Sequence, residues 1–165
     1  MTAPFRSGLI AAVVTLALDQ ASKLWLLFVF DLGFRGAVKV TPFFDLVLAW
    51  NPGISFGWLQ NDSPLAQIAL LMVKAVAVVV LAIWMARSRT VLATVALGLI
   101  IGGAIGNAID RLAYGAVVDF ALFHVRIGDN TFNWYVFNVA DVAIVAGVAA
   151  LLYDSFLGVP AAKAP

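Results

Sequence analysis

Cysteine is absent from the 165 residues of this chain, and so is glutamate, because all nine acidic residues are aspartates. The lack of cysteine excludes disulfides, thiol nucleophiles and thiolate metal ligands. His124 is the single histidine, so a metal site built from several imidazoles is excluded and a Ser-His-Asp triad would depend on this one base. The sequence also has no Walker loop and no dinucleotide fingerprint. We therefore expect neither a metal nor a cofactor, although aspartate oxygens could still hold a divalent cation.

Charge is equally scarce. Only 12% of the residues are charged, 64% are hydrophobic, and the mean hydropathy is +1.03, whereas about a quarter of the residues of a soluble domain are charged. This composition predicts an integral membrane protein. A net charge of +1 without a basic tract argues against nucleic acid as a partner. The length leaves room for one domain, so we expect residues 1–165 to form a single domain, and we expect a monomer.

Four apolar runs are long enough to cross the hydrocarbon core, for which about 20 residues suffice. They cover residues 8–30, 65–86, 91–109 and 136–157. The first run resumes after Lys23 without a small-x-small cleavage site, so we expect a retained helix and not a removed signal peptide. The short basic link Arg87-Ser88-Arg89 predicts a cytoplasmic turn, which places both termini, with Arg6 and Lys163, in the cytoplasm.

The two longer connections, residues 31–64 and 111–135, combine β-forming residues with turn residues. Partial alternation in Val38-Lys39-Val40-Thr41 and in residues 43–50 predicts short strands. Asn51-Pro52-Gly53 marks a turn. These patterns predict a small sheet on the outer surface of the membrane.

Several aspartates lie inside or beside the apolar runs, where a carboxylate is costly and usually serves a site or a relay. They are Asp19, Asp110, Asp119, Asp141 and Asp154. Asp19 and Lys23 are four residues apart and share a helix face, so they can pair. We interpret this pair as a structural one that fastens the first helix to the bundle.

The third apolar run ends in a polar group. Asn107, Asp110 and Arg111 follow at positions i, i+3 and i+4, so they lie on one helix face. We expect Arg111 to clamp Asp110 and keep it ionised, which favours a scaffold role for Asp110. The preceding stretch, residues 102–106, is rich in small residues and predicts close packing against another helix.

Asp119 and Asp141 have a different setting. The neighbours of Asp119 are apolar, which predicts a pKa raised by desolvation. Asn138 lies one turn before Asp141 on the same face. If the two carboxylates converge, they can share a proton, so that one activates water and the other donates to a substrate carbonyl. Asn51 could donate to a substrate carbonyl or simply close its turn.

Two further classes of function remain open on these residues. A small proton-coupled transporter could use Asp19, Asp110 and Asp141 as a relay, although the chain has no inverted repeat. A non-catalytic membrane assembly factor would bind a substrate without cutting it.

Five stretches, taken in order, resemble the motifs of the lipoprotein signal peptidases (signal peptidase II), aspartyl proteases of the bacterial inner membrane. They are residues 19–23 (DQASK), 51–56 (NPGISF), 102–111 (GGAIGNAIDR), 117–120 (VVDF) and 137–141 (FNVAD). Each motif alone is weak, but five in the family's order on a chain with four spans are specific.

The resemblance implies a membrane helix bundle of four spans with a small periplasmic β-cradle and a short periplasmic helix. It implies removal of the signal peptide from diacylglyceryl-modified prolipoproteins, just before the lipidated cysteine. Asp119 and Asp141 would then be the catalytic pair. Supporting or substrate-binding roles would fall to the other motif residues, namely Asn51, Asn107, Arg111, Asn138, Asp19, Lys23 and Asp110. The protein would lie in the inner membrane with its site near the periplasmic face.

Overall fold

The computed structural model describes residues 2–53 and 64–157. Two of the sequence features above fall outside these ranges. They are the end of the second motif, Ile54-Ser55-Phe56, and Lys163 near the C-terminal end.

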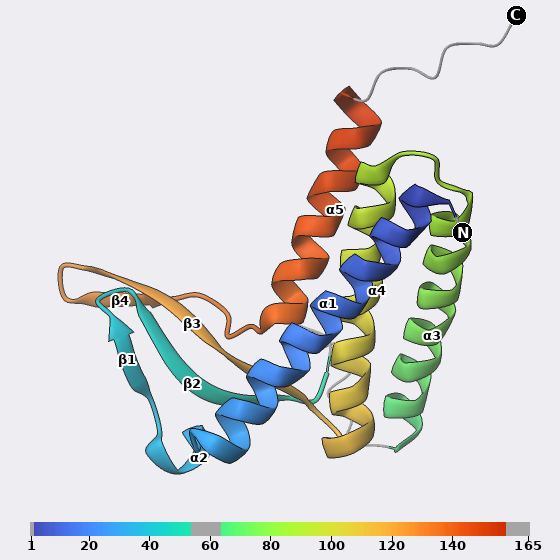
Figure 1. The fold of residues 1–165 in the computed structure, drawn as a ribbon. Coiled ribbons are helices and arrows are strands. Elements are labelled where there is room, and N and C mark those ends of the chain that lie inside the picture. Colours follow the sequence, from blue (N-terminus) through green and yellow to red (C-terminus); the bar gives the residue numbers. More distant parts are fainter. Residues whose placement is uncertain (1, 54–63, 158–165) are drawn as a thin grey trace, which may run out of the picture.

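Four long helices make up most of the described chain (Figure 1). They are α1 (Ala3–Leu24), which continues as a π-helical turn over Trp25–Val29, α3 (Pro64–Arg87), α4 (Val91–Tyr114) and α5 (Val139–Leu157). A short helix, α2 (Leu32–Arg35), follows the π-helical turn. Within the described residues, α1 with its continuation, α4 and α5 are long and apolar enough to cross a membrane.

Helix α4 extends five residues beyond the predicted end at residue 109. The prediction stopped where polar residues begin, but Asp110 and Arg111 are buried and continue the helix toward neighbouring elements. Gly115 then ends the helix in the left-handed conformation, with φ of 75°, which glycine adopts without a steric penalty.

The glycine-rich part of α4 lies between two other helices, which confirms the predicted packing role. A Cβ atom at Gly102 would overlap the backbone of Ala12 in α1, and one at Gly103 would lie 2.6 Å from the backbone oxygen of Ala140 in α5. The backbone of α4 is therefore in close contact with that of α1 on one face and with that of α5 on another. This close approach brings the polar residues near the end of α4 against both neighbours.

Four antiparallel strands form a sheet in the order β1-β2-β3-β4. Their bounds are β1 (Val38–Thr41), β2 (Phe44–Asn51), β3 (Val117–Ile127) and β4 (Asn130–Asn133). The first two strands confirm the short strands predicted for this part of the sequence. The pairing of β2 with β3 sets Asn51 opposite Val117 and Ala49 opposite Asp119, so Asn51 lies beside the start of β3.

The middle of β3 is fastened to the segment before α5. Ala121 and Phe137 exchange two backbone hydrogen bonds of 2.8 and 3.0 Å, and Phe120 also donates to the Phe137 carbonyl. Phe120 and Ala121 are buried in an apolar cluster with Leu26 and Leu32. The β3–β4 hairpin thus leaves the bundle and returns to it, so that β3 and the start of α5 lie together.

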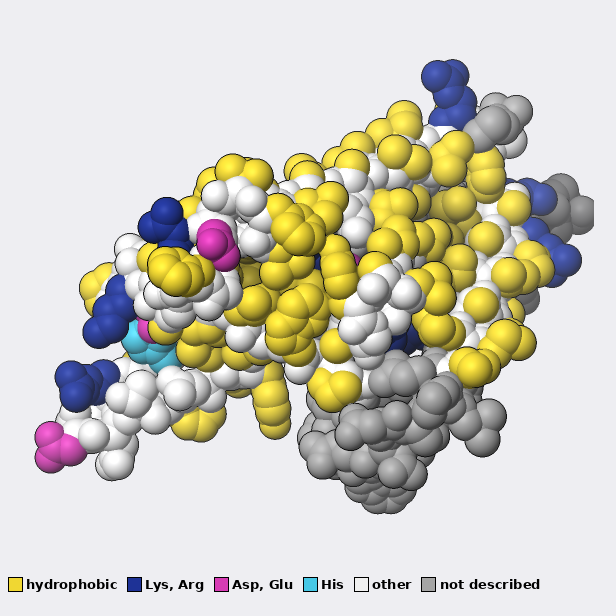
Figure 2. All heavy atoms as spheres, turned by 90° about the horizontal axis from the view of Figure 1, so that it is seen from below, with side chains coloured by type: hydrophobic (Ala, Val, Ile, Leu, Met, Phe, Trp, Pro, Cys, Tyr) yellow, Lys and Arg dark blue, Asp and Glu magenta, His cyan; other side chains and the backbone are white. Residues whose placement is uncertain are grey.

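The surface of the helical part is largely apolar. Figure 2 shows hydrophobic side chains over most of this face, with Lys and Arg side chains concentrated towards its two ends. Helix α1 begins and α5 ends at one end of the bundle, and the sheet projects from the opposite end (Figure 1). The distribution matches a protein whose middle faces lipid.

Candidate active site

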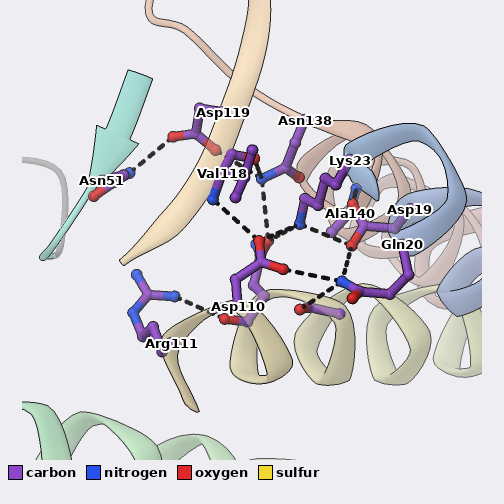
Figure 3. A network of polar contacts seen from close by, with 12 residues as sticks. Asp19, Gln20, Lys23, Asn51, Asp110, Arg111, Val118, Asp119, Asn138 and Ala140 are labelled. Atoms are coloured by element: carbon purple, nitrogen blue, oxygen red, sulfur yellow. Dashed lines mark hydrogen bonds and ion pairs between the residues drawn. The ribbon is translucent and has the colours of Figure 1, made fainter. Parts of the chain in front are cut away.

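A cluster of polar side chains is buried where the sheet meets the helices (Figure 3). Asp19, Lys23, Asp110 and Asn138 are each at most 1% exposed. Asn107, Arg111 and Asp119 are also buried. Since burial of unpaired polar groups is costly, each of these side chains needs partners.

Lys23 is the centre of the part of the cluster nearest α1. Its Nζ lies 2.8 Å from Asp19 Oδ2 and 2.7 Å from Asp110 Oδ2, and it donates a 3.1 Å hydrogen bond to Asn107 Oδ1. The three contacts match the three N–H groups of an ammonium. The predicted Asp19–Lys23 pair is therefore confirmed, with Asp110 as a second carboxylate on the same cation.

The two carboxylates paired with Lys23 also receive backbone N–H groups from other elements. Asp19 Oδ1 accepts from Ala140 N at 2.9 Å, in the first turn of α5, where N–H groups lack helical partners. Asp110 Oδ2 accepts from Val118 N at 3.1 Å, at the start of β3. Asp19 thus fixes the start of α5, and Asp110 fixes the strand residue next to Asp119.

The expected clamp of Arg111 on Asp110 is wrong. Asp110 pairs with Lys23, while Arg111 donates to the carbonyls of Asn107 at 3.2 Å and Gly53 at 3.4 Å. Adjacent residues on a helix point in different directions, so Asp110 and Arg111 face different neighbours. Nε of Arg111 is buried and has no hydrogen-bond partner among residues 2–53 and 64–157.

Gln20 is a member of the cluster that the sequence reasoning did not single out. Its Nε2 donates to Asp19 Oδ2 at 3.2 Å, to the Gly106 carbonyl at 3.2 Å and to Asp110 Oδ1 at 3.0 Å. The signal was available, because Gln20 lies beside Asp19 in a membrane-length run where a polar amide is uncommon. Gln20 connects the two carboxylates from α1.

Asn138 and Asp141 cap the start of α5 reciprocally. The Asn138 side chain accepts from Asp141 N at 3.0 Å, and Asp141 Oδ2 accepts from Asn138 N at 3.1 Å. This is the geometry of a capping box, with Asn at the N-cap and an acidic residue three positions later. The cap fixes the Asp141 side chain, and Asn107 donates to its other oxygen at 3.0 Å.

Asp119 is held by two asparagines from different elements. Asn138 Nδ2 donates to Asp119 Oδ1 at 2.7 Å, and Asn51 Nδ2 donates to Asp119 Oδ2 at 3.1 Å. Asn51 Oδ1 also accepts from Gly53 N at 3.3 Å, so it closes its turn as well as holding a carboxylate. Figure 3 shows the Asn51 and Asn138 side chains reaching Asp119 from its two sides.

The pKa of Asp119 is raised to about 6. Burial is the largest cause of the increase, and the hydrogen bond from Asn51 partly opposes it. The charge of Asp141 raises the pKa further, while the hydrogen bond from Asn138 lowers it. The raised pKa follows from the apolar surroundings predicted for this residue. The two carboxylates are also joined through one residue, because Asn138 donates its side-chain amide to Asp119 and its backbone N–H to Asp141.

Asp119 and Asp141 line the same cavity, of about 590 Å³, together with Asn51. One wall continues along α5 through Val142, Val145 and Ala149. Asn138 and Asn107 link the two carboxylates by hydrogen bonds. Asn138 Nδ2 donates to Asp119 and also to Asn107 Oδ1 at 3.1 Å, and Asn107 donates to Asp141. The arrangement presents two interacting carboxylates to a cavity with an apolar wall.

These features define a membrane protein with a buried carboxylate site at the sheet end of a helix bundle. The family model described as "Signal peptidase (SPase) II" matches residues 11–157. The chain belongs to the signal peptidase II family, and it is therefore a peptidase.

Relatives with high identity share nearly the full length. The chain is 75% identical to a lipoprotein signal peptidase of Nitrobacter hamburgensis over 98% of this chain and 99% of that protein. It is 70% identical to one of Rhodopseudomonas palustris over the same shares. One of Methylorubrum extorquens is 54% identical over the whole chain and 92% of that protein.

The fold matches solved structures of bacterial membrane enzymes. One has a TM-score of 0.74 at 24% identity, with 90% of this chain and 92% of that chain covered. A second has a TM-score of 0.69 at 25% identity, with 95% and 94% covered. These comparisons support neither the transporter nor the assembly factor.

Proposed function

We propose that this protein is an aspartic endopeptidase that removes signal peptides from diacylglyceryl-modified prolipoproteins, cutting just before the lipidated cysteine. The observation that carries the proposal is the pair Asp119 and Asp141, which line one cavity and interact electrostatically. The relatives named lipoprotein signal peptidase support the substrate class. The bilayer and the prolipoprotein are the partners.

The chemistry follows from two carboxyl groups that share one proton. The ionised carboxylate takes a proton from a water molecule, whose oxygen attacks the scissile carbonyl carbon, while the protonated carboxyl group donates to the carbonyl oxygen. The proton taken from water then passes to the leaving amide nitrogen as the C–N bond breaks. Because the pair titrates jointly, the proton belongs to the pair rather than to either residue.

The asparagines have positioning roles in this proposal. Asn138 and Asn51 donate to the two oxygens of Asp119, and Asn107 donates to Asp141. They leave the carboxylates fixed in the cavity wall, where a peptide can approach them. The Nε–H of Arg111, which has no partner in the part of the chain that the structure describes, is available as a donor for a substrate carbonyl.

The substrate's signal helix enters from the bilayer along the apolar wall of α5. Val142, Val145 and Ala149 continue the cavity away from the carboxylates. Val142 and Val145 are more than half exposed, so this wall is open to an apolar helix or to acyl chains.

The proposed topology has four membrane spans. Three are α1, α4 and α5, which are long and apolar enough to cross a membrane, and α3 is the fourth. Arg6 and Arg87 lie at the end of the bundle opposite the sheet. The positive-inside rule places that end in the cytoplasm and the sheet in the periplasm. The site would then lie near the periplasmic face of the inner membrane. The proposal keeps the two earlier predictions that the protein forms a single domain and is a monomer.

The test is cleavage of a diacylglyceryl-modified prolipoprotein by the purified protein in detergent, followed by mass spectrometry. Wild-type protein should release the signal peptide, while Asp119→Asn and Asp141→Asn should each lose at least about a thousandfold in rate and remain folded. Asp31→Asn is the matched control, because Asp31 has φ of 54°, a conformation that Asn tolerates. Substantial cleavage by either dyad variant would refute the assignment.

A further inference from the structure

A second cavity, of about 440 Å³, lies on the sheet and has no part in the proposed chemistry. Aromatic side chains form most of its lining, among them Phe43, Phe123 and Phe132. Of the described residues that line it, only His124 is ionisable, and its Nε2 atom lies 3.2 Å from Asp45 Oδ2. Phe132 is 62% exposed, so the aromatic cavity is open. An open apolar surface of this kind indicates a binding site.

The aromatic cavity adjoins the cavity of the candidate active site. Trp134 and Phe137 line both of them. The ring of Phe137 also stacks on that of Phe123, with 5.7 Å between the ring centroids. The two cavities therefore share one wall of aromatic side chains, and a single extended ligand can occupy both.

Strand β3 connects the two cavities as well. Asp119, near the start of β3, lines the active-site cavity, and Phe123 and Val125 line the aromatic cavity. These three residues are separated by even numbers of positions, so they lie on the same face of the strand. Val125 is paired with Phe132 of β4, which carries the apolar face onto the next strand.

The chain between β4 and α5 offers backbone groups where the two cavities meet. Tyr135 and Val136 line the active-site cavity. Among the described residues, their backbone N–H and C=O groups have no backbone partner, whereas the flanking Trp134 and Phe137 are hydrogen-bonded to β3. Backbone groups need partners. An extended peptide can supply them, as a strand does when it adds to the edge of a sheet.

The path of the substrate decides what the aromatic cavity receives. The signal helix precedes the cleaved bond and, in the proposed function, lies along the apolar wall of α5. The two routes away from the carboxylates diverge, because β3 runs outward into the sheet and α5 runs along the bundle towards the chain termini (Figure 1). The chain that follows the cleaved bond is therefore left with the route along the sheet. The acyl chains stay in the bilayer around the bundle, from which the sheet projects.

We propose that the aromatic cavity is a subsite for an apolar side chain of the prolipoprotein, in the segment that follows the lipidated cysteine. The inference rests on the proposed function of Asp119 and Asp141. Phe123 is four residues beyond Asp119, which corresponds to about 13 Å of extended chain. The cysteine is the first residue after the cleaved bond, so an extended substrate brings about the third residue after the cysteine to the cavity.

The experiment compares lipidated peptides that carry Leu, Ser or Lys at the third position after the cysteine. Wild-type protein should cleave the Leu peptide with a kcat/KM about tenfold above that of the Ser peptide, mainly through KM, because the cavity removes part of the Leu side chain from water. Val125→Asp places a carboxylate in the cavity, so it should remove the preference for Leu and favour Lys. Ile127→Asp is the matched control, because Ile127 lies on the same face of β3 but is not among the residues that line the cavity.

Two further substrates test the position and the occupant. Moving Leu from residue to residue along the peptide should give a preference limited to about the third position and its neighbours. A peptide that ends directly after the lipidated cysteine lacks the proposed occupant, so Val125→Asp should cleave it as fast as wild type does. Thermal unfolding in detergent checks that each variant is folded, and the peptide series on wild type tests the proposal without any variant.

A preference for Leu that Val125→Asp removes and Ile127→Asp keeps would support the proposal. Equal cleavage of the Leu and Ser peptides by wild type would overturn it, as would a preference that survives Val125→Asp. An equal loss on every substrate, including the shortened peptide, would also overturn it and indicate that the cavity holds acyl chains. A wild-type protein that cleaves none of the lipidated peptides would instead refute the proposed function, so the two failures are distinguishable.

Discussion

Asp119→Asn should gain stability relative to wild type as the pH rises towards neutral, while it removes activity. Burial raises the pKa of Asp119 from 3.8 to about 6, so between these values the folded state binds more protons than the unfolded state. Stability therefore falls as the pH rises through this window. The shift of about 2 pH units corresponds to about 3 kcal/mol of destabilisation that is fully present above the folded pKa. Asparagine does not ionise, so the variant escapes this cost.

The measurement is the difference in unfolding free energy between Asp119→Asn and wild type in detergent, as a function of pH. This difference should change in favour of the variant by about 3 kcal/mol from pH 3.5 to 7.5, with about 2 kcal/mol of the change above pH 4.5. Any constant cost of the new amide among Asn51 and Asn138 cancels in the change. For the Asp31→Asn control, the difference in unfolding free energy from wild type should not change with pH. A difference that is independent of pH would refute the reasoning.

Two further substitutions test the scaffold. Gly106→Ala should lower the free energy of unfolding by about 1–3 kcal/mol, because the added Cβ would overlap the Asp19 carboxylate. Gly33→Ala is the control, since a Cβ there would contact only Leu48, at 3.4 Å. An unchanged unfolding midpoint for Gly106→Ala would contradict the packing argument. Asp110→Asn removes one carboxylate from Lys23 and should cost about 2–4 kcal/mol in unfolding free energy, while folded molecules still cleave. A normally stable but inactive Asp110→Asn protein would show that this residue serves the chemistry directly.

Much of the fold could be predicted from local patterns. Membrane-length apolar runs place the long helices within a few residues, and alternation identifies β1 and β2. Asn138 and Asp141 lie at the spacing of a helix cap, and their hydrogen bonds have that geometry. These features depend on residues close in sequence, which is why periodicity and spacing suffice.

The partners within the site could not be predicted in the same way. Asp110 has an arginine next to it in sequence, yet its cation is Lys23, 87 residues away. The choice depends on the direction of each side chain around α4 and on the close approach of α1. Asn51 also reaches Asp119 only because β2 pairs with β3 in one register. Such contacts follow from tertiary packing, which one-dimensional spacing does not contain.

The fastening of β3 to Phe137 has a consequence for engineering. Asp119 lies two residues before Ala121 and Asp141 four residues after Phe137, and the backbone bonds between Ala121 and Phe137 hold these two points together. The β3–β4 hairpin beyond them turns at Gly128, with φ of 62°, and its tip is exposed. An epitope or fluorescent tag inserted after Gly128 would therefore lengthen the chain between the two aspartates without changing the distance between them in space.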